Sequence, residues 1–475
     1  MVIVGAGIAG LAAAFLMRDE PVRVTVLEGS SRIGGKLAVS QVAGVDVDEG
    51  AEGLYARRPK TKRLISAAGL DDRLVSAGTT STAIWTRGAL RPLPGRQFMG
   101  VPSDMDELAK TGVLSDAGVA RAREDLELPP SVRDGDVSVA AYVAERLGQE
   151  VVDRLVDPFV GDVCAGRAED LSFEAMLTPL AIASRKHSSL AGAAGSLAPP
   201  PLPPGEEPPT GLATLTGGMG TLPRALADAV LAASPGAAVR TGAAVSGLER
   251  SEGGWRVTVG SGADPEYISA DAVIIAVPAA PAGRLLSGLP GAAEAAAGLA
   301  EIPYADRLII TLAYPRRAFP GGLGGPGFCG YRVPAVDGRT VKDVTFTTVK
   351  WPHLAGEVEI VRCSVGRVGE EDALRRDDAD LAALAASEFA EATGATGDPV
   401  ATRVTRWAGA LPQYTVGHLN RVERIRDSVA SQPGLAVCGA AYDGVGVGNC
   451  VASAGKAVDQ VLGSLRSEAA APSKG

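Results

Sequence analysis

The first 30 residues constrain the fold more than any other part of the chain. A β-branched run, Val2 to Val4, is followed by glycines at positions 5, 7 and 10, a short apolar stretch with helical spacing, and a second alternating run that ends at Glu28. This order of strand, glycine turn, helix, strand and acid is the fingerprint of a dinucleotide-binding β-α-β unit.

Each part of that fingerprint has a physical role. The glycines allow a tight turn and let a pyrophosphate approach backbone N–H groups at the positive end of a helix, while the acid accepts hydrogen bonds from an adenosine ribose and disfavours a 2′-phosphate. We predict that the first part of the nucleotide site is formed by Gly5, Ala6, Gly7, Ile8, Ala9, Gly10, Glu28 and Gly29.

A second glycine loop follows at once. In Arg32-Ile-Gly34-Gly35-Lys36 the backbone can again approach an extended dinucleotide, and a guanidinium can meet its phosphates. We therefore add Arg32, Gly34, Gly35 and Lys36 to the predicted site.

Later segments indicate that the chain returns to the same sheet. The continuous apolar run 272–277, ended by Pro278, is typical of a buried parallel strand, and 435–437 is a shorter one. A glycine-rich turn and a helix from about Asn449 to Leu465 come next. We predict α/β architecture, with helices also at 60–68 and within 138–155, and strands at 82–85 and 255–259.

Composition and the remaining motifs exclude several function classes. With 475 residues the chain has room for two or three domains of roughly 150 residues, and its net charge of −9 disfavours nucleic acid as a partner. The five cysteines are scattered and unpaired, which predicts a reducing, cytoplasmic setting and no metal site. The apolar N-terminal stretch is shorter than the roughly 20 residues of a transmembrane helix.

Two further enzyme classes lack their motifs. No serine has glycines at both flanking positions of a hydrolase nucleophile elbow, and the Gly-Lys pairs at 35–36 and 455–456 are followed by Leu37 and Ala457 where a Walker loop needs Ser or Thr.

Longer strings carry a family resemblance. The N-terminal string with Glu28 and the second glycine loop resembles the flavin amine oxidase superfamily, which binds FAD. Within it, four segments resemble the FAD-dependent porphyrinogen oxidases, and most of all the soluble actinobacterial coproporphyrinogen oxidases: 157–166, 217–223, 407–418 and 439–450. The resemblance covers nearly the whole chain.

The resemblance implies a flavoenzyme of haem biosynthesis. Such an enzyme removes three hydride equivalents in turn from the methylene bridges of coproporphyrinogen III, with O₂ as acceptor and hydrogen peroxide as product, and the flavin performs the redox step. No catalytic side chain is required by the pattern. A haem-pathway protein is a further partner compatible with this family.

The resemblance also assigns further residues to the cofactor. It places residues 218–221 beside it and implies FAD contacts for Gly50, Ala51, Glu52, Val245, Trp407, Gly439, Val445, Gly446, Val447 and Val451. A helix beginning at the last of these segments would stabilise negative charge on a reduced flavin.

A substrate with four propionates needs local cations in an acidic protein. Candidates are Arg57, Arg58 and Lys60 in the basic run 57–63, with Lys350 as a further one that could instead hold a water near the flavin. A solvated basic helix face and a lysine capping a strand are the structural alternatives. For His418 we favour a structural role, and we predict no metal.

Three departures from the family pattern keep other functions open. Glu49 stands where relatives have an aliphatic residue, Cys164 replaces a common aromatic, and Gly448-Asn449 replaces an expected proline. The alternatives are protoporphyrinogen IX oxidation, a diverged amine oxidase or carotenoid-desaturase type of enzyme, and a flavin-bound protein that holds a porphyrin without turnover. The low aromatic content, 4%, weakens amine oxidation because that chemistry favours an aromatic cage.

The expected architecture is a Rossmann-like FAD-binding domain plus a mixed-sheet substrate domain with a helical subdomain. We assign 1–85, 210–275 and 405–468 to the discontinuous FAD domain and 86–209 and 276–404 to the substrate domain, with a flexible proline-rich loop at 188–212. The substrate cavity should lie between the domains, in front of the flavin.

Overall fold

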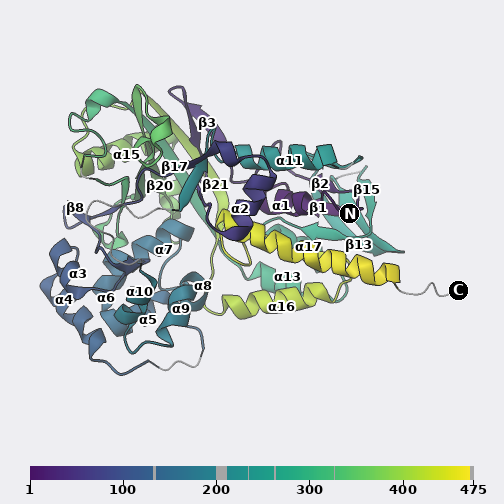
Figure 1. The fold of residues 1–475 in the computed structure, drawn as a ribbon, viewed down its shortest axis with the longest axis horizontal. Coiled ribbons are helices and arrows are strands. Elements are labelled where there is room, and N and C mark those ends of the chain that lie inside the picture. Colours follow the sequence, from purple (N-terminus) through teal and green to yellow (C-terminus); the bar gives the residue numbers. More distant parts are fainter. Residues whose placement is uncertain (132–134, 199–210, 234, 262–263, 326, 471–475) are drawn as a thin grey trace.

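The computed structural model describes residues 1–470 apart from 132–134, 199–210, 234, 262–263 and 326. Its elements form a parallel-sheet region, a large mixed sheet and a group of helices. In Figure 1 the parallel sheet lies with the N-terminus on the right, the mixed sheet at the upper left and the helical group at the lower left.

The N-terminal region is built on a five-stranded sheet in which every pair is parallel. In spatial order its strands are β12 (Ala238–Arg240), β2 (Thr25–Leu27), β1 (Val2–Val4), β16 (Val273–Ile275) and β22 (Leu435–Val437). Both faces are covered, as a parallel sheet requires. Ile3 belongs to one hydrophobic cluster, and its neighbours Val2 and Val4 belong to another on the opposite face.

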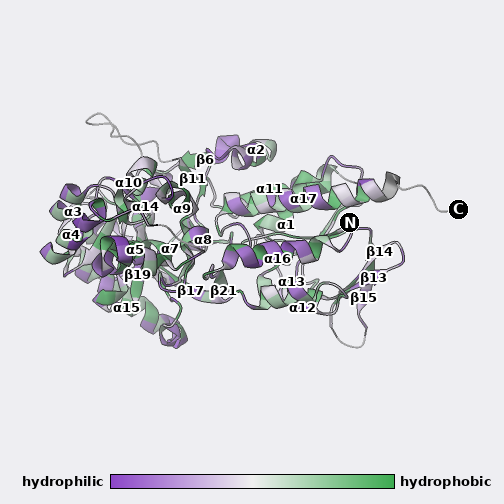
Figure 2. Cartoon of the chain, turned by 90° about the horizontal axis from the view of Figure 1, so that it is seen from below, coloured by the Kyte–Doolittle hydropathy of each residue, from purple (hydrophilic) through white to green (hydrophobic). Residues whose placement is uncertain are grey.

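Different helices cover the two faces. The Ile3 side packs on α1 (Ile8–Leu16), α11 (Thr221–Ala233) and α17 (Val447–Ala470). The other side packs on the antiparallel sheet β13 (Val245–Ser251), β14 (Gly254–Val259), β15 (Glu266–Ala270), and on α12 (Ala279–Ser287), α13 (Ala293–Ala300) and α16 (His418–Ala430). Helix α16 buries Val422, Ile425 and Val429 on one stripe, and Figure 2 shows it largely hydrophilic elsewhere.

The second sheet has seven strands and is antiparallel except between β18 and β7. In spatial order it contains β21 (Ala401–Pro412), β17 (Tyr304–Pro315), β20 (Val358–Val365), β19 (Val341–Phe346), β18 (Gly330–Arg332), β7 (Ala83–Thr86) and β8 (Ala89–Pro92). Helix α15 (Asp378–Thr393) packs on one face through Leu381, Ala385 and Phe389. Part of the other face packs on the hairpin β3 (Val39–Val42) and β4 (Val45–Asp48).

The helical group has a core of its own, centred on residues such as Leu108, Val143, Leu155 and Leu180. Its members are α3 (Met105–Thr111), α4 (Asp116–Arg123), α5 (Val139–Leu147), α6 (Gln149–Val151), α7 (Asp157–Cys164), α8 (Phe173–Met176), α9 (Thr178–Ser184) and α10 (Leu190–Leu197). A π-helical turn at Val152–Val156 leads into α7. Turns of this kind are frequent at functional sites.

Short elements join these regions. They are β5 (Leu54–Tyr55), α2 (Pro59–Ala67), β6 (Leu74–Ser76), β9 (Gln97–Phe98), β10 (Val101–Pro102), β11 (Leu212–Leu215), α14 (Thr347–Lys350) and the 3₁₀ turns at 71–73, 124–126, 316–318, 335–337, 352–354 and 371–375.

Three segments lie elsewhere than the predicted domain boundaries. Helices α12 and α13 fall in the predicted substrate segment 276–404 but pack on the parallel-sheet region. Strands β7 and β21 fall mostly in the predicted FAD segments 1–85 and 405–468 but belong to the seven-stranded sheet. Strand pairing and shared cores decide these placements, and neither can be read from local composition. We propose a domain division that moves these segments accordingly.

The predicted loop at 188–212 is also partly wrong. Residues Leu190–Leu197 form α10, capped by the Ser189 hydroxyl, which accepts the Gly192 N–H at 3.0 Å, and four of its residues are buried. The alanine-rich sequence forms a helix because small side chains pack closely against the helical core. Residues 199–210 lie outside the described part of the chain. Among the described helices, none is long and apolar enough to cross a membrane.

Candidate functional site

The glycine turn after β1 leaves no room for side chains. Gly5 has φ +105°, and a Cβ there would lie 2.8 Å from the Ala276 carbonyl oxygen; a Cβ on Gly10 would lie 1.9 Å from the Gly5 carbonyl oxygen. Gly7 caps the start of α1. The three glycines thus let β1, β16 and α1 approach closely enough to present a helix N-terminus at the carboxyl edge of the sheet.

Glu28 is held in place by backbone groups. Its two carboxylate oxygens accept the Ala6 N–H at 2.9 Å and the Ser30 N–H at 2.8 Å. These bonds fix the carboxylate beside the glycine turn, where its remaining lone pairs can accept ribose hydroxyls. Gly29 lies against Ala244, next to Val245 at the start of β13, so these two residues border the same end of the predicted site.

The second glycine loop docks on the first. The Gly34 N–H donates to the Ala6 carbonyl at 2.8 Å, and Gly7 and Gly34 pair as a parallel bridge. A Cβ on Gly35, which has φ +56°, would lie 3.3 Å from the Cα of Gly7. The two loops therefore form one backbone surface of the kind that accommodates a pyrophosphate.

Trp407 of strand β21 connects the mixed sheet to Glu49 and to Arg32 of the second glycine loop. The Trp407 indole donates to the Glu49 carbonyl at 2.8 Å, and the exposed Arg32 guanidinium lies 5.6 Å above its ring. Gly50 is as constrained as Gly10, because a Cβ there would lie 2.1 Å from the Lys36 carbonyl oxygen. Residues 36, 50, 51 and 407 thus line one cavity, and their contact with FAD stays a prediction.

The C-terminal turn provides the opposite wall. Gly439 donates its N–H to the Ser453 hydroxyl at 3.2 Å. Helix α17 begins at Val447, and residues of its first turn line the first cavity. Val447 and Val451 are buried on the helix side. The N-terminus of this helix carries positive potential and can stabilise negative charge on a group bound beside it.

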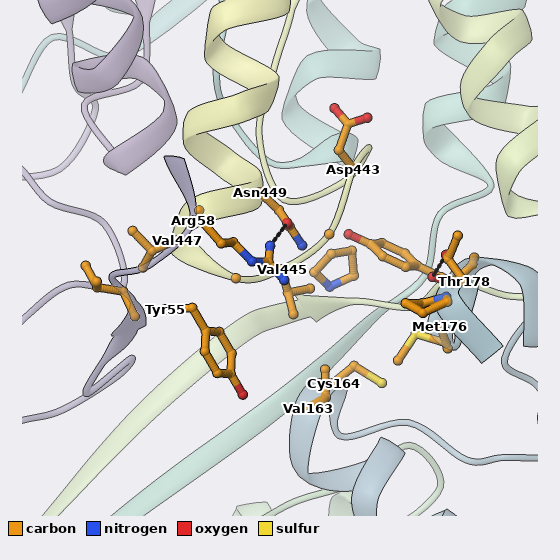
Figure 3. A pocket seen from close by; sticks show the side chains of 18 of the residues that line it. Tyr55, Arg58, Val163, Cys164, Met176, Thr178, Asp443, Val445, Val447 and Asn449 are labelled. Atoms are coloured by element: carbon orange, nitrogen blue, oxygen red, sulfur yellow. Dashed lines mark hydrogen bonds between the residues drawn. The ribbon is translucent and has the colours of Figure 1, made fainter. Parts of the chain in front are cut away.

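The unusual Gly448-Asn449 pair has a structural explanation. A Cβ on Gly448 would lie 2.8 Å from the Thr61 hydroxyl, so glycine lets α17 approach α2 closely. The Asn449 amide oxygen accepts a 2.5 Å hydrogen bond from Arg58, as Figure 3 shows. The departure from the family pattern therefore positions Arg58.

Two cavities meet at Val163, Val445 and Gly446. The first, of about 510 Å³, lies between the helical group and the C-terminal turn; Figure 3 shows Tyr55, Arg58, Val163 and Cys164 around it. The second, of about 390 Å³, lies against the seven-stranded sheet and is lined by Lys36, Gly50, Ala51, Glu52, Trp407 and a set of sheet residues. Together they form the interdomain space expected for a flavin ring and a substrate.

Two ion-pair groups line the second cavity. Glu52 accepts the Lys350 ammonium at 2.5 Å and the Arg362 guanidinium at 2.6 Å. Burial alone would raise the pKa of the Glu52 carboxyl, but the two cations outweigh it and lower that pKa to about 2. Burial would likewise lower the pKa of Lys350, and Glu52 outweighs it, so this lysine stays charged.

The second group is centred on Asp162 of α7. Its carboxylate accepts Arg332 at 2.9 Å and lies 3.5 Å from Arg307, and the two guanidiniums outweigh burial, so its pKa stays below the ordinary value. Burial lowers the pKa of Lys36 on the opposite wall.

Some predicted residues lie outside the cavities. Arg57 and Lys60 are exposed and absent from the described walls of either cavity; Arg57 packs along Gly211. Of the basic run, Arg58 alone among the described lining residues reaches a cavity. Lys350 lines the second cavity, paired with Glu52 rather than free.

Most charged residues of the second cavity were not among the residues predicted from the sequence: Asp162, Arg307, Arg332, Asp343 and Arg362. Asp162 lies inside the segment 157–166 that carried the resemblance, so it could have been singled out. The others are on separate strands, and only strand pairing brings them together.

His418 is fully buried, and its ring stacks on Tyr414 with the ring centroids 4.0 Å apart. Burial lowers its pKa to about 4, which keeps it neutral and fits a structural role. Among the residues that the structure describes, no group of three or more His, Cys, Asp or Glu side chains could hold a metal ion, and all five cysteines are free and buried.

A comparison with protein families matches residues 8–462 to the flavin containing amine oxidoreductases. The chain belongs to this family. It is an FAD-dependent oxidoreductase, and the fused glycine loops, Glu28 and the α17 N-terminus fit such a cofactor.

The chain is also similar to individual proteins that are named as porphyrinogen oxidases. The chain is 35% identical over 473 residues to the coproporphyrinogen III oxidase of Mycobacterium tuberculosis, covering 98% of each chain, and 29% identical to that of Bacillus subtilis, covering 97% of each. It is 28% identical to the protoporphyrinogen oxidase of Bos taurus, covering 98% of each.

Solved structures share the fold. The "Putative protoporphyrinogen oxidase from Exiguobacterium sp. 255-15" matches with a TM-score of 0.83, 27% identity and 98% coverage of each chain. Cyclohexylamine oxidase from Brevibacterium oxydans matches with a TM-score of 0.69 at 17% identity, which supports the fold alone.

Proposed function

We propose that this chain oxidises coproporphyrinogen III to coproporphyrin III in haem biosynthesis, with O₂ as electron acceptor and hydrogen peroxide as product. The observation that carries the proposal is the 35% identity to coproporphyrinogen III oxidase over 98% of both chains. The two adjoining cavities beside the α17 N-terminus support it, because they offer space for a flat, extended substrate next to the cofactor wall.

The bound FAD would supply the hydride acceptor. The protein's own residues hold and orient it. The two glycine loops receive the pyrophosphate, Glu28 the ribose, and the α17 N-terminus favours negative charge on the ring. Residues Lys36, Gly50, Ala51 and Trp407 border the same space from the other side.

Arg58 is the proposed ligand of a substrate propionate. It lines the first cavity, and its described partner there is the neutral amide of Asn449. Arg307, Arg332, Lys350 and Arg362, by contrast, are already paired with Asp162 or Glu52. A guanidinium that is positioned but not neutralised suits recognition of a carboxylate.

Protoporphyrinogen IX is the second candidate substrate. The first cavity also carries apolar walls from Leu54, Val163, Met176 and Val445, which suit the vinyl groups of that molecule. The bovine relative bears the corresponding name at 28% identity.

The test is aerobic incubation of the purified yellow protein with freshly reduced coproporphyrinogen III and, separately, protoporphyrinogen IX. Porphyrin fluorescence and peroxide are followed together, against flavin-free protein as a control for spontaneous oxidation. Faster formation of coproporphyrin with matching peroxide is expected. Bound FAD with neither product would refute porphyrinogen oxidation, and porphyrin without peroxide would refute O₂ as the acceptor.

A further inference from the structure

One row of side chains crosses the cavity face of the seven-stranded sheet. Arg332 of β18, Asp343 of β19, Ser364 of β20 and Ile309 of β17 are successive register partners. Directly opposed residues of antiparallel strands point to the same face, and all four line the 390 Å³ cavity. Asp343 therefore presents its carboxyl group to this cavity from the middle of the sheet.

The three acids of this cavity differ in their partners. Glu52 is paired with Lys350 and Arg362, and Asp162 with Arg332 and Arg307. Arg332 lies opposite Asp343, yet its guanidinium donates to Asp162 and to the Thr82 hydroxyl at 2.8 Å. Within the described residues, the Asp343 side chain has no hydrogen-bond or ion-pair partner.

The Asp343 side chain is partly exposed and has no partner among the described residues, so its carboxyl group can accept a hydrogen bond from a donor that enters the cavity. Burial, together with the like charge of Asp162, raises the pKa of Asp343 to about 7. Arg332, Arg307 and Lys350 oppose that rise from β18, β17 and α14. Arg362 and Ser364 border it from β20, and Tyr331 and Cys363 lie in the core on the opposite face of the sheet.

We propose that Asp343 faces the pyrrole N–H groups of the substrate and accepts the proton released at each oxidation. The inference rests on the proposed function. Pyrrole N–H groups are donors without an acceptor of their own, and a carboxylate is the acceptor that the cavity leaves unpaired. The porphyrinogen centre, with its four N–H groups, thus matches the one unpaired acid among the described lining residues.

The protons released during porphyrinogen oxidation define the role of Asp343. In each round a methylene C–H bond breaks, its hydrogen leaves with two electrons as hydride to the FAD, and one proton is also lost. Over the three rounds these protons are two from pyrrole N–H groups and one from the fourth methylene bridge, so the porphyrin keeps two N–H groups and four methine bridges. The released proton passes to an oxygen of the Asp343 carboxylate, giving the carboxylic acid, which returns the proton to solvent before the next round. Asp343 must therefore be ionised when substrate binds, so oxidation should rise with pH through about 7.

The test uses the FAD-loaded variants Asp343→Asn and Asp343→Glu, with Asp398→Asn, an exposed acid remote from both cavities, as the matched control. Flavin bleaching by coproporphyrinogen is followed without oxygen across neutral pH, and flavin content and melting temperature are recorded for each variant. Removal of a proton acceptor is expected to slow bleaching by about 100-fold or more and to abolish the acidic limb of the pH profile. The glutamate variant should regain a limb with a shifted midpoint.

An Asp343→Asn variant that bleaches at the wild-type rate, or that is slow with the same acidic limb as wild type, overturns the assignment. If the asparagine variant fails to hold FAD, the glutamate variant decides: an unmoved limb overturns the proposal and a moved one supports it. Wild-type protein that oxidises no porphyrinogen refutes the proposed function, and the Asp343 role with it. Active wild type with an unchanged Asp343→Asn profile refutes the Asp343 role alone.

Discussion

Replacement of Glu52 by glutamine tests the charge network of the second cavity. The carboxylate binds Lys350 at 2.5 Å and Arg362 at 2.6 Å, and its side chain is only 15% exposed. Glutamine keeps the shape and one acceptor oxygen but removes the charge. Two buried cations, themselves 18% and 8% exposed, then lose their counter-ion.

The expected loss of stability follows from two independent arguments. The fall in the Glu52 pKa from 4.5 to about 2 corresponds to roughly 3 to 4 kcal/mol at neutral pH, at about 1.4 kcal/mol per pKa unit. Removal of one partner from a buried ion pair typically costs about 3 to 5 kcal/mol. We expect Glu52→Gln to lower the free energy of unfolding by about 3 kcal/mol.

The assay is urea unfolding with saturating FAD, followed by tryptophan fluorescence. Asp372→Asn is the matched control, because its ion pair with Arg375 is exposed, at 96% and 78%, and should contribute well under about 1 kcal/mol. The double variant Glu52→Gln/Lys350→Met should recover part of the loss, since it also removes one of the unpaired cations.

The pH dependence gives a second check. Because the folded-state pKa of Glu52 is depressed, its contribution is fully present above pH 4.5 and is lost as the pH falls towards 2. The difference between wild type and Glu52→Gln should shrink across that window. A Glu52→Gln variant within about 0.5 kcal/mol of wild type at neutral pH, or one whose deficit does not change with acid, would refute the reasoning.

Three further outcomes are expected. Gly10→Ala should be purified without flavin absorbance, because its Cβ would lie 1.9 Å from a backbone oxygen of the cofactor turn; full flavin content would contradict this. Arg58→Ala should raise the KM for coproporphyrinogen about tenfold with flavin content unchanged, whereas Arg284→Ala on the surface of α12 should not; equal KM values would remove Arg58 from the substrate site. The five thiols should react with a chromogenic disulfide only after unfolding, since all are buried and burial raises the pKa of Cys164 to about 11; rapid labelling of native protein would be the contrary result.

The parallel-sheet region was predictable because its signals are local. Backbone conformation requires glycine at position 5, lack of space for a Cβ requires it at position 10, and apolar runs mark β16 and β22 as buried parallel strands. The order of these strands still needed the structure. The same reason limits prediction of the boundaries between regions. Helix α12 and strand β21 have ordinary sequences, and only their packing partners assign them to one region or the other.

The cavity was predictable only in part. Glu52 and Lys350 were named as candidates from separate motifs, but nothing in the sequence indicates that they bind each other 298 positions apart. Arg332, Asp343 and Arg362 lie in unremarkable strands, and their shared face depends on the register of β18, β19 and β20. A shift of the strand register by one residue would have turned their side chains to the opposite face of the sheet, into its hydrophobic core.

The strand order of the parallel sheet has a consequence for biosynthesis. The sheet begins with β1 at residue 2 and is completed only by β22 at 435–437, and α17 then covers the face formed by α1 and α11. A nascent chain on the ribosome thus exposes the apolar edge of β16 and the uncovered side of α1 until β22 and α17 have emerged. Assistance by chaperones is therefore most valuable while β22 and α17 are still missing.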